Sequence, residues 1–289
     1  MLVLMFGQLM GCGTLRELTD ITTAHGKKSK HLGFGDKPVN RQMLSKANLL
    51  RDHRIFEEFA FHMVSIAQSK RVTKEFELHG RFYAIDSTII DLCMSVFRWA
   101  EFRSTKSGIK VHMQIDIATE IPVFYRITNA KVHDVNSMDW FTYEALACYV
   151  FDRGYFDLAR LYQIHVFGAF FIIREKGKPA YEIVDGESIL DGTDNVLKDQ
   201  SIRFTKKENQ KKYPGTVRRI VYYAPELRRS FVYYTNNFFL SAKDIALLYK
   251  YRWQVELFFK WIKQHLQVKR FWGESENAVR IQIHIAIIT

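Results

Sequence analysis

The segment FYAID at residues 82–86 and the segment CYVFD at residues 148–152 are the two stretches on which the predicted fold rests. Each is a short apolar run that ends in a carboxylate, and runs of this kind are typical of buried strands. The two carboxylates, Asp86 and Asp152, converge if these strands are neighbours in one sheet. The sequence therefore predicts a buried sheet with an acidic site where two of its strands end.

Strand-like and helix-like patterns alternate on both sides of these two segments. The order β-β-β-α-β-α-β predicts an α/β fold, in which a mixed sheet is flanked by helices. Asp134 and Asn136 are candidate caps of the first helix. The expected elements are strands at residues 82–86, 110–116, 121–128, 148–152 and 169–174 and helices at residues 137–147 and 158–166.

The regions before and after this core differ in character. Residues 1–75 are expected to form a helical, DNA-binding region with basic connections; a helix-turn-helix-like unit within it competes with an ordinary bundle that has a solvated basic face. Residues 177–240 combine short strand-like runs with basic pairs and are expected to form a β-rich insertion. The predicted core therefore has two parts, residues 76–176 and residues 241–289.

The second part of the core opens with a capping box, Ser241 followed by Asp244, which predicts a long helix to about Gln267. The alternation at residues 279–287 favours a final strand. An apolar stripe on the long helix would pack against the sheet. This stripe contains Leu248, Val255, Phe259, Ile262 and Leu266.

Composition and charge exclude several classes of protein and of binding partner. The chain has 289 residues, of which 47% are hydrophobic, so it can bury a core without disulfides or structural metals. Its net charge of +11 favours a polyanionic partner over a small acidic metabolite. Three cysteines form no disulfide framework and fit a reducing cytoplasm. No segment reaches the apolar length of a transmembrane helix, and no membrane partner is expected.

A row of chemically active side chains lies along one face of the predicted long helix. At about 100° per residue this face carries Tyr249, Arg252, Glu256, Lys260 and Lys263. A single acid among three bases is unusual for a merely solvated face, although an i,i+4 ion-pair ladder would also explain it. The pattern alone leaves both interpretations open.

Three carboxylates in the sequence could hold divalent metal. Asp86 and Asp152 end two strands, and Glu256 could reach them from the packed helix. Clustered carboxylate oxygens are what Mg²⁺ prefers, and two such ions about 4 Å apart support phosphoryl transfer. The basic residues Arg252, Lys260 and Lys263 could then hold phosphates. The combination indicates a nuclease-like site that acts on nucleic acid.

The same residues resemble a known family. The spacing Tyr249-x2-Arg252-x3-Glu256-x6-Lys263 matches the Y-x2-R-x3-E-x6-K signature of the insertion sequence 4 family of bacterial DDE transposases. The segments around Asp86 and Asp152 look like the first and second aspartate motifs of this family, and all three motifs occur in order. The resemblance covers about residues 81–285 and implies a ribonuclease H-like core with a β insertion.

The resemblance also implies a mechanism and partners. Asp86, Asp152 and Glu256 would bind two Mg²⁺ or Mn²⁺ ions, and Tyr249, Arg252, Lys260 and Lys263 would contact DNA phosphates. The enzyme would hydrolyse double-stranded DNA at terminal inverted repeats, free a 3′-hydroxyl and join it to target DNA. It would act as a homodimer on DNA, at the nucleoid in the cytoplasm.

Three questions stay open at this stage. Relatives usually extend further at both ends, so a truncated, inactive DNA-binding copy is one alternative, and a ribonuclease H-like nuclease without strand transfer is another. A hairpin step, which some relatives support with a tryptophan in the insertion, is also open. All five tryptophans lie outside residues 177–240, and Tyr213, Tyr222 or Tyr223 would have to substitute.

Overall fold

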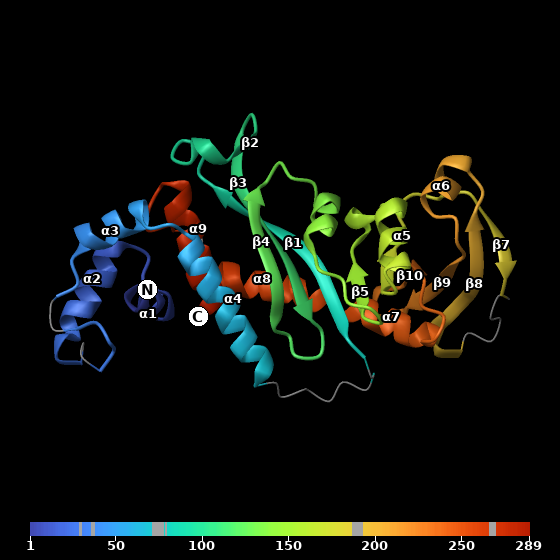
Figure 1. Cartoon of the computed structure of the whole chain (residues 1–289), viewed down its shortest axis with the longest axis horizontal. Helices are drawn as coiled ribbons and strands as arrows, with labels where there is room; N and C mark the ends of the chain where they lie inside the picture. Colours follow the sequence, from blue (N-terminus) through green and yellow to red (C-terminus); the bar gives the residue numbers. More distant parts are fainter. Residues whose placement is uncertain (29–30, 36–37, 71–77, 79, 187–192, 266–269) are drawn as a thin grey trace.

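A large mixed sheet runs through the middle of the molecule, with helices against it and at one end (Figure 1). The computed structural model describes residues 1–28, 31–35, 38–70, 78, 80–186, 193–265 and 270–289. Within these ranges ten strands belong to the sheet, in the order β2-β3-β1-β5-β6-β10-β9-β8-β7, and β4 pairs with β3. The expected α/β fold is confirmed.

The centre of the sheet has the predicted ribonuclease H-like arrangement. Strand β3 lies antiparallel to both β1 and β4, whereas β5 is parallel to β1 and β6 is parallel to β5. Helix α5 (Leu158–Val166) makes the crossover between the two parallel strands β5 and β6. The strands are β1 (Phe82–Leu92), β2 (Glu101–Arg103), β3 (Lys106–Asp116), β4 (Pro122–Asn129), β5 (Cys148–Phe151) and β6 (Phe170–Arg174).

The residues between 177 and 240 continue the same sheet. Strand β10 pairs antiparallel with β6, and β9, β8 and β7 follow in an antiparallel series. The division of the chain into four regions stays a prediction, and its boundary at residues 75 and 76 lies outside the described residues. The added elements are β7 (Tyr181–Asp185), β8 (Val196–Phe204), α6 (Lys207–Lys212), β9 (Val217–Ala224) and β10 (Arg229–Thr235).

A buried arginine ties this extension to the helix that follows it. Arg218 on β9 donates to both oxygens of Asp199 at 2.6 and 2.8 Å. It also donates to the carbonyls of Asn237 and Leu240, at 3.2 and 2.6 Å, just before the next helix begins. The start of that helix is therefore fixed by the added strands.

The predicted long helix is two helices, α7 (Ala242–Tyr251) and α8 (Trp253–His265). The chain turns at Arg252, whose N–H is shared between the carbonyls of Leu248 and Tyr249 at 3.3 Å each, so the regular helical pairing is interrupted. The expected apolar face is present, because Leu248, Val255, Phe259 and Ile262 are buried. The predicted end of the helix, including Leu266 and Gln267, lies outside the described residues.

The prediction of a final strand at residues 279–287 is wrong. This segment belongs to α9 (Glu276–Ile288), which Ser275 caps by accepting a hydrogen bond from the Ala278 N–H at 3.2 Å. Nearly every residue of α9 from Ala278 to Ala286 is buried. A helix that is covered on all sides has no polar face, so its 3.6-residue period is hidden in the sequence.

Two further expectations need correction. The helix expected at residues 137–147 is a 3₁₀ helix, η3 (Asp134–Trp140), and the chain becomes extended at Phe141, whose ring packs on Phe124 with centroids 5.5 Å apart. Strand β1 does not end at Asp86 but continues to Leu92, because its second half pairs with β3 alone. Asp86 is therefore a mid-strand residue at the point where β5 ends.

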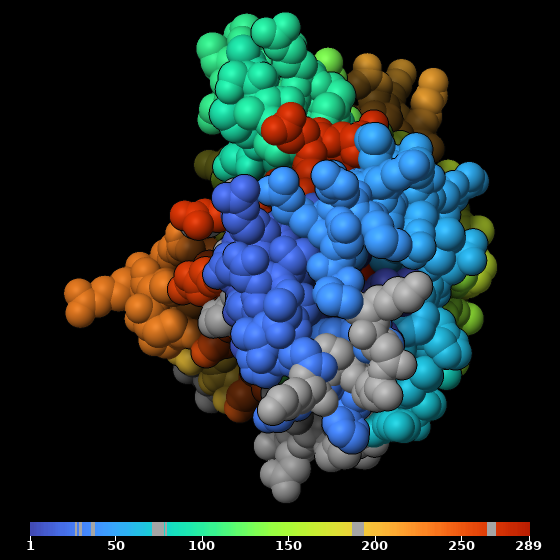
Figure 2. Space-filling view, turned by 90° about the vertical axis from the view of Figure 1, so that its left-hand side faces the viewer, coloured from blue at the N-terminus to red at the C-terminus, as the bar shows by residue number. Residues whose placement is uncertain are grey.

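Four helices near the N-terminus pack with α9 at one end of the molecule (Figures 1 and 2). Their shared core includes Leu4, Leu18, Phe56, Trp272 and Ile285. No helix in the described part of the chain is both long enough and apolar enough to cross a bilayer. The helices are α1 (Leu2–Leu9), α2 (Leu15–Ala24), α3 (Arg41–Leu50) and α4 (Arg54–Ser69), and the remaining 3₁₀ turns are η1 (Gly26–Lys28), η2 (Arg98–Ala100), η4 (Arg153–Tyr155), η5 (Thr193–Asn195) and η6 (Pro225–Leu227).

Candidate active site

Asp86 and Asp152 are brought together by the pairing of their strands. Strands β1 and β5 run parallel, and the last pair in their register is Ile85 with Phe151. Asp86 and Asp152 each follow that pair by one residue. Both apolar runs are buried in the sheet, so burial of the runs carries the two carboxylates to the same edge.

Arg252 connects the strand carboxylate to the helix carboxylate. Its Nη1 donates to Oδ2 of Asp86 at 2.7 Å, and its Nη2 donates to Oε1 of Glu256 at 2.7 Å. The Arg252 side chain is 9% exposed. Because the guanidinium is a planar fork with several donors, a single residue can hold two carboxylates from different elements. A shared arginine therefore connects Glu256 to the sheet carboxylate.

Tyr249 makes the corresponding link to Asp152. Its hydroxyl donates to Oδ1 of Asp152 at 3.4 Å, which is a long hydrogen bond. Its ring packs on Tyr233 of β10, with centroids 4.6 Å apart, and the Arg252 guanidinium lies 5.5 Å from the Tyr249 ring centroid. The end of α7 and the residue between α7 and α8 thus contact both strand carboxylates.

Burial sets the electrostatics of the site. Desolvation raises the pKa of Asp86 to about 6, and the Arg252 guanidinium opposes this rise. Glu256 and Asp152 add to the rise, because like charges disfavour a further ionised carboxylate. Desolvation likewise raises the pKa of Tyr249 to about 12. The pKa of Asp86 therefore lies close to neutral pH, and a cation bound beside the carboxyl would favour its charged form.

A cavity of about 490 Å³ opens beside the carboxylates. Lys260 and Lys263 of α8 line it together with Asp86 and Glu256, so the two lysines face the same space as two of the acids. Desolvation lowers the pKa of Lys263, and the charge of Asp91 partly opposes that effect. The remaining lining residues are Ser87, Thr88, Phe259 and Gln264.

The donor set fits a hard divalent cation. Asp86, Asp152 and Glu256 offer carboxylate oxygens, which Mg²⁺ and Mn²⁺ prefer to nitrogen or sulfur ligands. Among the described residues these three do not all have ligand atoms within 4.8 Å of one another. Shared cations would therefore require the side chains to move closer, and one oxygen each of Asp86 and Glu256 is already engaged by Arg252.

A fourth carboxylate, Asp134, lies at this site, and no sequence motif predicted it. Oδ1 of Asp134 accepts from the Ser87 hydroxyl at 2.5 Å and from Lys110 Nζ at 3.0 Å. A Cβ built on Gly154 would lie 3.9 Å from Oδ2 of both Asp134 and Asp152, so the two acids flank the same glycine. Asp134 was interpreted only as a helix cap, and no spacing in the sequence marks its approach to Asp152.

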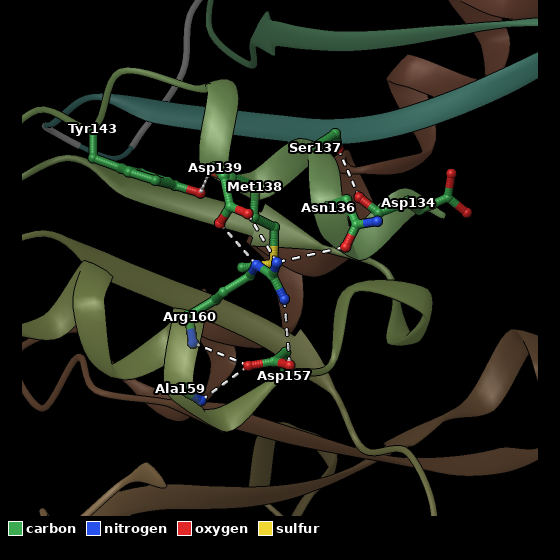
Figure 3. A network of polar contacts seen from close by, with 9 residues as sticks. All are labelled: Asp134, Asn136, Ser137, Met138, Asp139, Tyr143, Asp157, Ala159 and Arg160. Atoms are coloured by element: carbon green, nitrogen blue, oxygen red, sulfur yellow. Dashed lines mark hydrogen bonds and ion pairs between the residues drawn. The ribbon is translucent and has the colours of Figure 1, made fainter. Parts of the chain in front are cut away.

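The turn that carries Asp134 is anchored from the opposite side (Figure 3). Arg160 of α5 donates to both oxygens of Asp139 at 2.8 Å, and a weaker contact joins it to Asn136 at 3.5 Å. In the figure the Asp134 carboxylate points away from Arg160. The arginine therefore fixes η3 while the acid at its start stays directed toward Ser87 and Lys110.

Comparison with known proteins identifies the family to which the chain is similar. Residues 77–289 match the family described as the transposase DDE domain. A protein of Sinorhizobium fredii described as a transposase is 33% identical over 249 residues, which cover 85% of this chain and 68% of that protein. A protein of Geobacillus stearothermophilus, described as a transposase for the insertion sequence element IS5377, is 30% identical over 71% of this chain and 53% of its own length.

Two more distant similarities extend the comparison. A Synechocystis protein described as a transposase for the insertion sequence element IS4SA is 27% identical over 90% of this chain and 72% of its own length. The solved synaptic complex of the piggyBac transposase with hairpin DNA aligns with a TM-score of 0.48 at 10% identity, over 99% of this chain and 63% of that chain. The chain thus spans between 53% and 72% of the length of the three sequence relatives.

Proposed function

Because this chain belongs to the transposase DDE domain family, we propose that it cuts DNA at the ends of an insertion sequence and joins the freed ends to target DNA. The family implies binding to DNA and dependence on divalent metal. The identity of the metal, its number of two ions and the assembly of a homodimer on the terminal repeats are parts of the proposal. Its place of action would be the nucleoid, where the DNA substrate lies.

One observation carries the proposal. The carboxylates of Asp86, Asp152 and Glu256 come from two strands and a helix, and they are connected by Arg252 and Tyr249 beside a cavity that two lysines line. Arg252 bonds two of the three acids, whereas the third, Asp152, accepts from the neutral Tyr249 hydroxyl. The acids held here by hydrogen bonds thus outnumber the one cation bonded to them, and each keeps an oxygen that could bind a metal ion.

Each group has a role in phosphoryl transfer. Asp86, Asp152 and Glu256 would hold two Mg²⁺ or Mn²⁺ ions, which supply an activated nucleophile and stabilise the leaving oxygen. Lys260 and Lys263 would hold DNA phosphates at the cavity. Arg252 fixes the positions of Asp86 and Glu256 relative to each other. The contacts of Tyr249 and Arg252 with DNA stay a prediction, since both are buried in the absence of DNA.

The reaction proceeds in two displacements that need no covalent enzyme intermediate. Water first attacks the phosphodiester at the end of the element, and the bond to the 3′ oxygen breaks, which frees a 3′-hydroxyl. That hydroxyl then attacks a phosphodiester of the target, so one bond forms as another breaks. Because the chemistry is the same in both steps, one set of carboxylates serves both.

The proposal is tested with duplexes that carry the element's own terminal repeats. The full chain is incubated with labelled DNA and Mn²⁺ or Mg²⁺, and nicked and joined products are separated on a denaturing gel. We expect both products from the wild type and from the matched controls Glu208→Gln and Glu274→Gln, which are exposed residues outside the cavity. Asp86→Asn and Glu256→Gln should abolish both products.

The outcomes separate the alternatives. Cutting that survives Glu256→Gln would remove the proposed mechanism. Nicks without joined products would identify a nuclease that lacks strand transfer. Salt-sensitive DNA binding without cleavage in any divalent metal would identify a DNA-binding chain that has lost catalysis.

A further inference from the structure

A second group of potential metal ligands lies far from the carboxylates, where the N-terminal helices meet α9. It consists of His53, Glu57 and His284, and one ligand atom of each lies within 4.8 Å of the others. His53 is the residue before α4, Glu57 lies one turn further along that helix, and His284 is on α9. The two helices contact each other along this stretch (Figure 1).

Two imidazole nitrogens in this group have no partner. Nδ1 of His53 and Nε2 of His284 are buried and make no hydrogen bond with any described residue. The His284 residue is 1% exposed. A buried polar atom without a partner costs about 1–3 kcal/mol, so two at one place call for an explanation. One cation bound to the lone pairs of both nitrogens would give each of these buried atoms a partner.

Neighbouring residues hold both rings in position. The Tyr125 hydroxyl lies 2.7 Å from Nδ1 of His284, so the remaining nitrogen, Nε2, is directed away from the tyrosine. The His53 and His284 rings stack with centroids 5.7 Å apart and an interplanar angle of 12°. A hydrogen bond to the second ring nitrogen is the usual support of a histidine that binds metal.

The backbone around His53 is fixed as well. The His53 N–H donates to the Asn277 side chain at 3.0 Å. Asn277 in turn donates to the carbonyls of Asn48 and Arg51 at 2.8 and 2.7 Å. The first turn of α9 thus holds the connection between α3 and α4, and the three ligands are on prearranged elements.

We propose that His53, Glu57 and His284 bind one Zn²⁺ ion, which clamps the N-terminal helices to the last helix of the catalytic core. Two imidazoles and a carboxylate suit Zn²⁺, with water in the fourth position, whereas Mg²⁺ prefers oxygen ligands only. Ligand atoms on one tetrahedral Zn²⁺ lie about 3.4 Å apart. Those of this group lie within 4.8 Å of one another, so binding requires the side chains to close in and the stacked rings to turn.

The charged side chains around the group are three acids and one arginine, and the arginine is itself paired. Arg280 is engaged by Glu276 at 2.8 Å and by the Ile127 carbonyl at 3.1 Å. Glu57, Asp52 and Glu276 act on His53 with negative charge, whereas Arg280 acts on both histidines with positive charge.

The experiment measures Zn²⁺ and Co²⁺ binding to the full chain in excess Mg²⁺, which occupies oxygen sites and competes poorly for imidazole. Zn²⁺ affinity is obtained by competition with a chromophoric chelator, and Co²⁺ is followed by its visible d–d bands. We expect one tight site per wild-type chain. Glu57→Gln should weaken it at least tenfold, while Glu58→Gln, an exposed neighbour on the same helix, leaves it unchanged.

A second pair of variants covers the histidines. His53→Ala should abolish the Co²⁺ bands, and His62→Ala, which removes an exposed histidine of the same helix, should retain them. Zn²⁺ should also raise the Tm of the wild type and of Glu58→Gln, because it binds only the folded state. Equal affinity in Glu57→Gln and Glu58→Gln, or no Co²⁺ spectrum in the wild type, overturns the proposal.

Discussion

Replacing Arg252 tests how the carboxylates are held together. Arg252→Lys keeps the charge but replaces a planar fork by one ammonium, which cannot reproduce both 2.7 Å hydrogen bonds. A hydrogen bond to a charged group contributes about 1.5–3 kcal/mol, so we expect the free energy of unfolding to fall by about that amount. Arg252→Met removes the cation altogether and should cost about 3–5 kcal/mol at pH 7.5.

The loss of unfolding free energy in Arg252→Met should depend on pH, because the ionisation of Asp86 does. The pKa of Asp86 in the folded protein is raised to about 6, so the folded state takes up a proton more readily than the unfolded state between pH 6 and pH 4. At pH 5 the carboxyl is already mostly neutral and no longer needs its cation. The penalty of Arg252→Met should therefore shrink as the pH falls from 7.5 to 5, leaving mainly the contribution of Glu256.

The assay is urea unfolding in EDTA at both pH values. Arg54→Met is the matched control, because Arg54 pairs with Asp52 at the surface, where its side chain is 72% exposed. Such a pair contributes at most about 1 kcal/mol. Two results would contradict the idea that Arg252 holds Asp86 and Glu256 together. One is an Arg252→Lys variant as stable as the wild type, and the other is an equal loss of unfolding free energy in Arg252→Met at pH 7.5 and pH 5.

Three further predictions concern stability, pH and DNA. Arg218→Met leaves Asp199 and two carbonyls without their donor, and thermal unfolding should show a loss of about 3–5 kcal/mol. Burial lowers the pKa of His112 from 6.5 to about 4, so the unfolded state binds more protons in that window and stability falls as the pH falls. His112→Gln should remove about 2 kcal/mol of the change in unfolding free energy between pH 7 and pH 5. Lys263→Gln should reduce the slope of log affinity for DNA against log salt by about one.

Matched controls accompany these three predictions. Arg203→Met, which breaks an exposed pair with Glu182 on the adjacent strand, should cost less than about 1 kcal/mol. An unaltered pH profile in His112→Gln would show that this histidine titrates normally. Lys178→Gln changes the same charge at an exposed position away from the cavity, and an equal slope in Lys178→Gln and Lys263→Gln contradicts a specific phosphate contact.

The strand pattern and the three-part motif could be predicted because they are local. The apolar runs before Asp86 and Asp152 and the spacing from Tyr249 to Lys263 are visible without any tertiary contact. The approach of Asp134 to Asp152 is not, since it depends on where a turn between two strands is placed against the sheet. Periodicity likewise cannot show that Arg252 is buried between two acids.

The errors have the same physical origin. Helix α9 is buried between α1, α3 and α4 and the core of the sheet, so most of its residues are covered and no polar face reveals its period. The segment after Trp140 leaves its helix to bury Phe141, a tertiary contact that outweighs local propensity. In both cases a partner distant in the sequence decides the local structure.

The central claim is that Asp86, Asp152 and Glu256 jointly hold a pair of divalent cations. Electron paramagnetic resonance during Mn²⁺ titration tests it directly, with the full chain bound to a duplex that carries the terminal repeat. The account predicts two Mn²⁺ with a spin-coupled signal in the wild type and in Glu208→Gln, and loss of that signal in Asp152→Asn. A coupled pair that persists in Asp152→Asn, or its absence from the wild type, contradicts the account.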